Sequence, residues 1–157
     1  MGVLASIIDK SISGGFSSEV FKIGQNAFRS CNNLTEVSFP NAMGIDSNAF
    51  YQCNSLNSVS FPNATSIGFS AFELCRSLTE VSFPAATSIG NYAFHNCSNL
   101  TTIYVGTNTS TVCTLSNTNA FNRCTSLTNI YVPASLVNSY KSATNWSNYA
   151  DKIKAAP

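Results

Sequence analysis

One sequence pattern, Ala-Phe-x-x-Cys-x-x-Leu, recurs five times along this chain and constrains its fold more than any other feature. Phe28, Phe50, Phe72 and Phe94 are each spaced by 22 residues, and Phe121 follows after 27. With its flanks the unit reads I-G-x-x-A-F-x-x-C-x-x-L-x-x-V-x-F-P. A fixed period of this length is typical of solenoids, because a coil so short buries its apolar face only against the next coil.

Each part of the unit predicts a short element. In L-x-x-V-x-F the alternation indicates a strand with Val37 and Phe39 inward and Glu36 and Ser38 outward, which the proline then ends. The A-F-x-x-C part places apolar side chains three residues apart, as in a single helical or tight turn. Two short elements per coil predict stacked strands about 4.8 Å apart in a parallel sheet on one side of the solenoid.

These residues resemble the leucine-rich repeats of the BspA type, which occur in bacterial and protist surface proteins and in proteins of mobile elements. The resemblance covers five units from Ile23 to about Pro133. It implies an α/β fold: a right-handed leucine-rich-repeat solenoid of five coils of about 22 residues, with a parallel sheet on one face, short helical turns on the other, and caps at both ends. It also implies roles in adhesion or recognition.

The domain boundaries follow from the repeat: an N-terminal cap over 1–22, five leucine-rich repeats over 23–133 and a C-terminal helical cap over 134–157. A terminal coil exposes one apolar layer, which a cap must cover. We expect Ser135 to cap a helix that contains Leu136, Val137 and Tyr140. Apolar residues expected to cover the first coil are Val3, Leu4, Ile7, Ile8 and Ile12, and a second C-terminal helical piece is expected to hold Trp146, Tyr149 and Ile153.

The composition argues against nucleic acid as a partner. Eight Lys and Arg balance seven Asp and Glu, and charged residues make up only 10% of the chain. Binding to a phosphate backbone needs a basic stripe that this chain does not have. Its 24 Ser, 14 Thr and 19 Asn predict a surface rich in hydroxyl and amide groups instead.

The start of the chain predicts neither membrane insertion nor a signal peptide. Its apolar stretch from Val3 to Ile8 is far shorter than the roughly 20 residues that span a bilayer, and Lys10 follows it instead of preceding it. Export would therefore have to be encoded elsewhere, and we expect an extracellular or cell-surface location as part of a larger exported protein. The alternative is a virion, whose proteins assemble in the cytoplasm.

The cysteines predict neither a metal site nor a cofactor. There is no C-x-x-C pair and only one histidine, His95. The last spacing, from Phe94 to Phe121, is five residues longer than the others, and we call the segment Thr107 to Asn119 that holds these extra residues the expansion. Cys113 lies in it, and we expect an ordinary loop cysteine open to solvent there. Five cysteines at the repeat spacing predict a buried column of reduced thiols: Cys31, Cys53, Cys75, Cys97 and Cys124.

Catalysis is not expected. His95 is the only imidazole, and we place it on the solvated outer surface. Glu36 and Glu80 occupy the same repeat position two coils apart, about 10 Å from each other, a separation that an inverting glycosidase pair could have. Such a pair needs one carboxyl with a raised pKa, and nothing on an open sheet face raises the pKa of one above that of the other.

Equivalent positions of successive repeats form columns along the solenoid. Columns with the same residue in every coil are expected in the core, and columns that vary between coils are expected on the surface. The outward strand columns end in two stacked tyrosines, a residue type enriched in recognition patches. The alternative interpretation of these tyrosines is a stabilising cross-strand pair. Candidate ligand-binding residues on the sheet face are Tyr104, Tyr131, Thr102, Asn129, Glu80 and Glu36, and a second candidate face on the turn side contains Tyr51, Phe69, Tyr92 and His95.

The sequence therefore predicts a non-enzymatic recognition or adhesion module that binds a protein or glycan on a cell surface through the sheet face. One alternative is a phage or prophage tail component that recognises a host cell. Another is a purely structural spacer. The sequence indicates no particular oligomeric state and no ligand identity.

Overall fold

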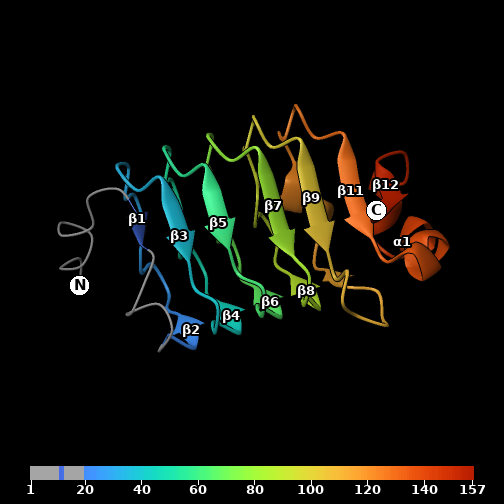
Figure 1. Ribbon diagram of the computed structural model, residues 1–157. Coiled ribbons are helices and arrows are strands. Elements are labelled where there is room, and N and C mark those ends of the chain that lie inside the picture. The colour runs from blue at the N-terminus through green and yellow to red at the C-terminus, as the bar shows by residue number, and fades with distance from the viewer. Residues whose placement is uncertain (1–10, 13–19) are drawn as a thin grey trace.

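The computed structural model describes residues 11–12 and 20–157, and these form a solenoid whose coils stack in a row (Figure 1). We number the coils 1 to 5 by Phe28, Phe50, Phe72, Phe94 and Phe121. One side of the row carries two parallel sheets that lie side by side, and together we call them the main sheet. The first consists of β1 (Ser11–Ile12), β3 (Glu36–Ser38) and β5 (Ser58–Ser60). The second consists of β7 (Glu80–Phe83), β9 (Thr102–Val105), β11 (Asn129–Val132) and β12 (Ile153–Ala155).

The register of the main sheet places equivalent repeat positions side by side. Val81 pairs with Ile103, and Ile103 pairs with Ile130. Along β7 the residues alternate between exposed and buried, with Glu80 outward and Val81 inward. The predicted strand and its inward and outward faces are therefore confirmed.

A second parallel ladder, not predicted from the sequence, runs along the opposite edge of the coils. Each of its strands has two residues, of which the isoleucine or leucine points into the core. The strands are β2 (Lys22–Ile23), β4 (Gly44–Ile45), β6 (Ser66–Ile67), β8 (Ser88–Ile89) and β10 (Thr114–Leu115). Each coil thus has three short elements where the sequence pattern indicated two.

The A-F-x-x-C segments are tight turns in coils 1 to 4, and only coil 5 has a 3-10 helix there, η2 (Thr118–Phe121). The residue before each cysteine has a left-handed backbone, as at Gln52 (φ 59°) and Leu74 (φ 65°). In this conformation the N–H of Gln52 donates to the carbonyl of Glu73 in the next coil, 2.8 Å away. The turns are therefore held in place by hydrogen bonds between coils.

The core between the two ladders is built from stacked columns of identical residues. The ring of Phe72 lies 5.1 Å from that of Phe50 and 5.4 Å from that of Phe94, with interplanar angles of 5° and 4°. The cysteines form the neighbouring buried column of free thiols, as predicted. The Cys75 thiol donates to the carbonyl of Phe50 at 3.1 Å, and burial raises the pKa of this thiol well above its usual range.

The C-terminal cap consists of η3 (Ala134–Leu136), α1 (Val137–Ser142), η4 (Trp146–Tyr149) and β12. Two predictions about it are wrong. Ser135 makes no capping bond, because it lies inside η3 and the chain turns into α1 at Leu136. Ile153 is not helical: it begins β12, which extends the main sheet by pairing with Ile130 of β11. Trp146 packs against Phe121 of the last coil and is only 1% exposed.

Cys113 is a further correction, because it is fully buried and not an open loop residue. The expansion between Thr107 and Asn119 folds back beneath the cap. There the N–H of Cys113 donates to the Tyr140 hydroxyl at 2.9 Å, and its carbonyl accepts from the Trp146 indole at 2.6 Å. Burial raises the pKa of the Cys113 thiol to about 12.

At the N-terminus, the predicted covering residues Val3, Leu4, Ile7 and Ile8 lie outside the described residues. Ile12 belongs to β1, which pairs with β3 opposite Val37, so the segment predicted as a cap contributes a strand to the main sheet. Within the part of the chain that the structure describes, no helix has the length and apolar character needed to cross a bilayer.

Candidate functional site

Two tyrosines near the C-terminal end of the main sheet form its largest aromatic surface. Tyr104 on β9 pairs with Tyr131 on β11, and their rings stack with centroids 4.9 Å apart at 24°. The same column holds Ser82 on β7, so the small polar column changes to aromatic at coil 4. Both rings remain partly exposed. The predicted stacking of the tyrosines is therefore confirmed.

A row of polar groups lies next to the tyrosines. Asn129 donates through Nδ2 to the Thr102 hydroxyl at 3.4 Å, and its Oδ1 accepts from Lys154 Nζ at 2.6 Å. Glu80 stands beside Thr102 on the other side and is exposed. Thr102 itself is only 8% exposed, so its role is to hold the Asn129 amide. We call Glu80, Thr102, Tyr104, Asn129, Tyr131 and Lys154 the sheet-face cluster.

The surroundings of the cluster raise the pKa of one tyrosine hydroxyl. Burial, the Glu80 carboxylate and the neighbouring Tyr131 all raise the pKa of Tyr104. A tyrosine hydroxyl is already neutral at neutral pH, so this shift leaves Tyr104 able both to donate and to accept. Beside it stand one carboxylate, one amide and one ammonium group, which together suit an uncharged polar ligand.

The structure separates one predicted residue from this cluster and adds another. Glu36 lies on β3 opposite Ser58, with β5 between it and Glu80 on β7, so it does not join the cluster. Lys154 joins it because β12 pairs with β11 and brings this lysine opposite Tyr131. Sequence reasoning missed Lys154, since the segment around Ile153 was predicted to be helical.

The turn side carries a smaller aromatic group. Phe69 is 48% exposed and meets Tyr92 edge to face at 5.8 Å, and Tyr92 meets His95 in the same way at 5.3 Å. Tyr51 lies apart from these residues, under the Arg29 guanidinium at 4.9 Å.

The sequence predicted that His95 lies on the solvated outer surface, but in the structure this side chain is partly covered. Its Nδ1 lies 3.1 Å from Oε1 of Glu73, and each of the two side chains is only 18% exposed. The column that appears variable in sequence is therefore partly covered by contacts between neighbouring coils. Three of the four residues predicted for this face do meet, and Tyr51 does not.

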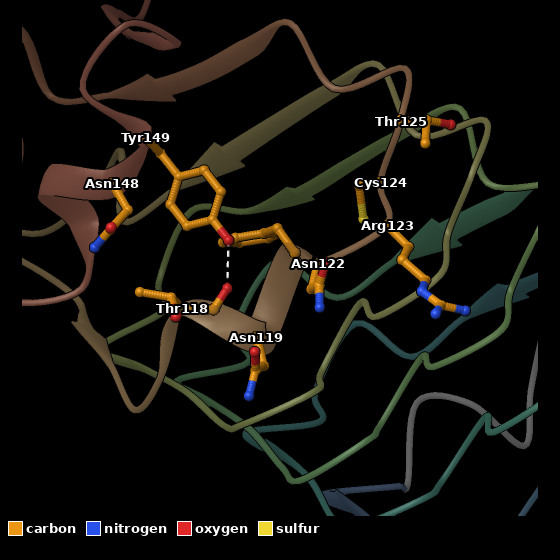
Figure 2. A pocket seen from close by; sticks show the side chains of 9 residues that line it. Thr118, Asn119, Asn122, Arg123, Cys124, Thr125, Asn148 and Tyr149 are labelled. Atoms are coloured by element: carbon orange, nitrogen blue, oxygen red, sulfur yellow. Dashed lines mark hydrogen bonds between the residues drawn. The ribbon is translucent and has the colours of Figure 1, made fainter.

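An open groove of about 400 Å³ lies at the C-terminal end of the turn side (Figure 2). Tyr149 from the cap closes one wall, where its hydroxyl donates to the carbonyl of Thr118. Sequence reasoning did not indicate this groove, because it forms where the cap meets coil 5. The residues that line it are Thr118, Asn119, Phe121, Asn122, Arg123, Cys124, Thr125, Asn148 and Tyr149.

Residues 20–157 contain no group of three or more His, Cys, Asp or Glu placed to hold a metal ion. The five repeat thiols are spread along the solenoid, one to a coil, and Cys113 lies apart from them beneath the cap. Each repeat thiol from coil 2 to coil 5 donates to a backbone carbonyl of the preceding coil, as Cys97 does to Phe72 at 3.1 Å. Their place is in the core.

Comparison with protein families matches the chain to the model described as a BspA type leucine-rich repeat region (6 copies), over residues 10–114 and again over 43–151. No curated protein sequence matches the chain.

Solved structures share the fold. A leucine-rich repeat protein from Bacteroides ovatus has a TM-score of 0.70 and 24% identity over 95% of this chain and 36% of its own. A leucine rich cell surface protein from Faecalibacterium prausnitzii has a TM-score of 0.67 and 26% identity over 94% of this chain and 36% of its own. A T. pallidum leucine-rich repeat protein has a TM-score of 0.66 and 26% identity over 74% of this chain and 54% of its own. The chain thus spans about a third of the length of the first two proteins.

Proposed function

Because this chain belongs to the BspA-type leucine-rich repeat family, we propose that it is a non-enzymatic recognition module that binds a protein or glycan on a cell surface. Solenoids of this kind present extended surfaces that bind partners. The Tyr104–Tyr131 stack is the observation that carries the proposal. It gives the main sheet a rigid aromatic platform in an otherwise small and polar row.

The polar groups beside the platform support ligand binding over a purely stabilising role. A stabilising tyrosine pair needs only its own ring contact, whereas here Asn129 is fixed between Thr102 and Lys154. Fixed amide and hydroxyl groups next to an aromatic surface provide orientation and specificity in ligand sites. A neighbour with the same fold is described as a cell surface protein, which favours an extracellular or surface location for this chain.

The test is staining of cells with a fluorescent multimer of the protein. The panel contains gut-type bacteria and mammalian epithelial cells, each before and after treatment with protease or with periodate, which oxidises glycans. We expect staining of one cell type, lost after only one of the two treatments. Staining of epithelium supports an adhesin, staining of bacteria supports the phage-type host-recognition alternative, and staining of neither leaves the structural spacer.

Variants assign the staining to the sheet face. Tyr104→Ala/Tyr131→Ala should reduce staining about tenfold or more, because the platform is removed. The control is Phe21→Ala/Met43→Ala, which truncates two exposed apolar side chains (65% and 58% exposed) on another part of the surface. Equal loss in both variants would contradict the sheet face as the site.

A further inference from the structure

The turn of coil 5 has a backbone N–H whose counterpart in each of coils 1 to 4 donates a hydrogen bond to the next coil. In coils 1 to 4 the residue before the cysteine has a left-handed backbone, and its N–H donates to a carbonyl of the next coil. The four N···O distances are 2.7 Å for Ser30 to Tyr51, 2.8 Å for Gln52 to Glu73, 2.9 Å for Leu74 to His95 and 2.9 Å for Asn96 to Asn122.

Arg123 occupies this position in coil 5 with the same backbone conformation, φ 61°. Within residues 20–157 its N–H has no acceptor. Because the conformation is the same, this N–H points past the last turn, to where the next coil would lie. The groove lined by Arg123, Cys124, Asn148 and Tyr149 occupies that place (Figure 2).

The cap covers the rest of coil 5 but leaves this corner open. Trp146 and Tyr149 cover the Phe121 ring, with centroids 5.9 Å and 5.4 Å away, and β12 pairs with β11 of coil 5. Cys124 remains 8% exposed, whereas Cys75 in the middle of the solenoid is fully buried. The open corner therefore has a partly apolar floor, since Phe121 and Cys124 are among the residues that line it.

The charge in the groove selects among peptides. Arg123 is its only charged lining residue, and none of the lining residues is a carboxylate. A guanidinium pairs best with a carboxylate, with which it forms charge-assisted hydrogen bonds. An acidic segment thus matches both the free N–H and the guanidinium.

We propose that this groove binds an acidic peptide segment of a partner protein, with a main-chain carbonyl accepting from the Arg123 N–H and a carboxylate beside the Arg123 guanidinium. The segment continues the ladder of hydrogen bonds between turns by one step. A second copy of the chain does not fit as the occupant, because β12 and Trp146 already cover the area that the flat face of another coil would need. The site is separate from the sheet-face cluster.

The probe is a pentapeptide, acetyl-Ala-Phe-Glu-Leu-Ser-amide, which copies 71–74 of coil 3 and ends in serine in place of Cys75. In the solenoid the carbonyl of Glu73 fills the matching position above Gln52. The measurement is a titration followed by ¹⁵N–¹H NMR of the full chain. We expect the amide proton of Arg123 to move downfield as it gains an acceptor, while that of Gln52, already bonded, stays in place.

Two variants separate the backbone donor from the charge. Arg123→Gly keeps the left-handed N–H but removes the guanidinium, and should weaken binding of the probe about threefold to fivefold, as expected for an exposed ion pair. Asn148→Trp fills the groove and should abolish binding. The matched control is Gln52→Gly, the same kind of change where the donor is already used, and it should bind the probe as wild type does.

Three results would overturn the proposal. The first is an Arg123 resonance that does not move at millimolar peptide. The second is equal affinity of wild type, Arg123→Gly and Asn148→Trp. The third is an Arg123 shift that follows protein concentration without peptide, which would indicate self-association. Tyr104→Ala/Tyr131→Ala should bind the probe normally, so failure here leaves the sheet-face proposal intact.

Discussion

The indole Nε1 of Trp146 donates a hydrogen bond to the carbonyl of Cys113 at 2.6 Å, and both residues are buried. This bond joins the cap to the expansion that precedes coil 5. Two segments more than 30 residues apart in sequence therefore close the solenoid together.

Replacing this indole should cost stability even when the ring is kept. Trp146→Phe preserves an aromatic plug but leaves the Cys113 carbonyl buried without its donor, so we expect the free energy of unfolding to fall by about 1 to 3 kcal/mol. Urea denaturation followed by circular dichroism measures this change. A loss below about 0.5 kcal/mol would show that the bond does not hold the cap.

Removal of a central phenylalanine should destabilise the stack. Phe72 touches rings in both neighbouring coils, so Phe72→Ala should lower the free energy of unfolding by about 3 to 5 kcal/mol through the cavity it leaves. Ser60→Ala, on the exposed face of β5, should stay within about half a kcal/mol of wild type. Thermal melting of the two variants compares them directly, and similar curves would refute the stacked core.

Two glycines at the same repeat position should respond differently to alanine. A Cβ on Gly68 would lie 2.7 Å from the backbone carbon of Asp46, whereas one on Gly24 meets nothing within 4 Å. Gly68→Ala should therefore cost about 1 to 3 kcal/mol of unfolding free energy, and Gly24→Ala should be neutral or stabilise by up to about 1 kcal/mol. Chemical denaturation of both variants tests the close approach of coils 2 and 3, which equal effects would contradict.

The buried thiols should make the protein lose stability in alkali. Burial raises the pKa of Cys113 from 9.0 to about 12 and that of Cys31 to about 11. Below pH 9 these thiols are protonated in both the folded and the unfolded chain, so their contribution to stability is fully present. As the pH rises from 9 toward 12 the unfolded chain releases these protons first, and the free energy of unfolding falls. Denaturation at a series of pH values measures the slope.

Cys113→Ala should make that slope shallower, because one of the shifted thiols is gone. The same burial should protect Cys113 from alkylation in the folded protein at pH 8. Rapid labelling of Cys113 under native conditions, located by mass spectrometry, would contradict its position beneath the cap.

The repeat predicted the main sheet and the stacked core because each coil repeats the same inward residues, with Val37 and Phe39 alternating at period two. The second ladder was missed because each of its strands contributes only one inward side chain, such as Ile45, so no alternation marks it. At coil 5 the longer spacing also hid Leu115, which pairs with Ile89 on β8. A single apolar residue followed by glycine does not distinguish a strand from a turn.

The site was only partly predictable. Tyr104 and Tyr131 follow from the strand register, but Lys154 reaches them through β12, a pairing between segments that share no repeat pattern. His95 was placed in solvent because it stands two residues before Cys97, an offset that does not share a face with the buried cysteine, yet Glu73 of the preceding coil lies next to it. Contacts between coils depend on which side chains are neighbours in space. A comparison of repeat positions one by one does not include these contacts.

The most direct test of the central claim is an equilibrium binding titration on whichever cells the protein stains, with the two faces of the solenoid compared. The proteins are wild type, Tyr104→Ala/Tyr131→Ala on the sheet face and Tyr51→Ala/Phe69→Ala on the turn side, each first shown to melt as a folded solenoid. We predict that the sheet-face variant binds at least about tenfold more weakly and that the turn-side variant keeps its affinity. Loss of affinity in the turn-side variant with full binding by the sheet-face variant would contradict the account.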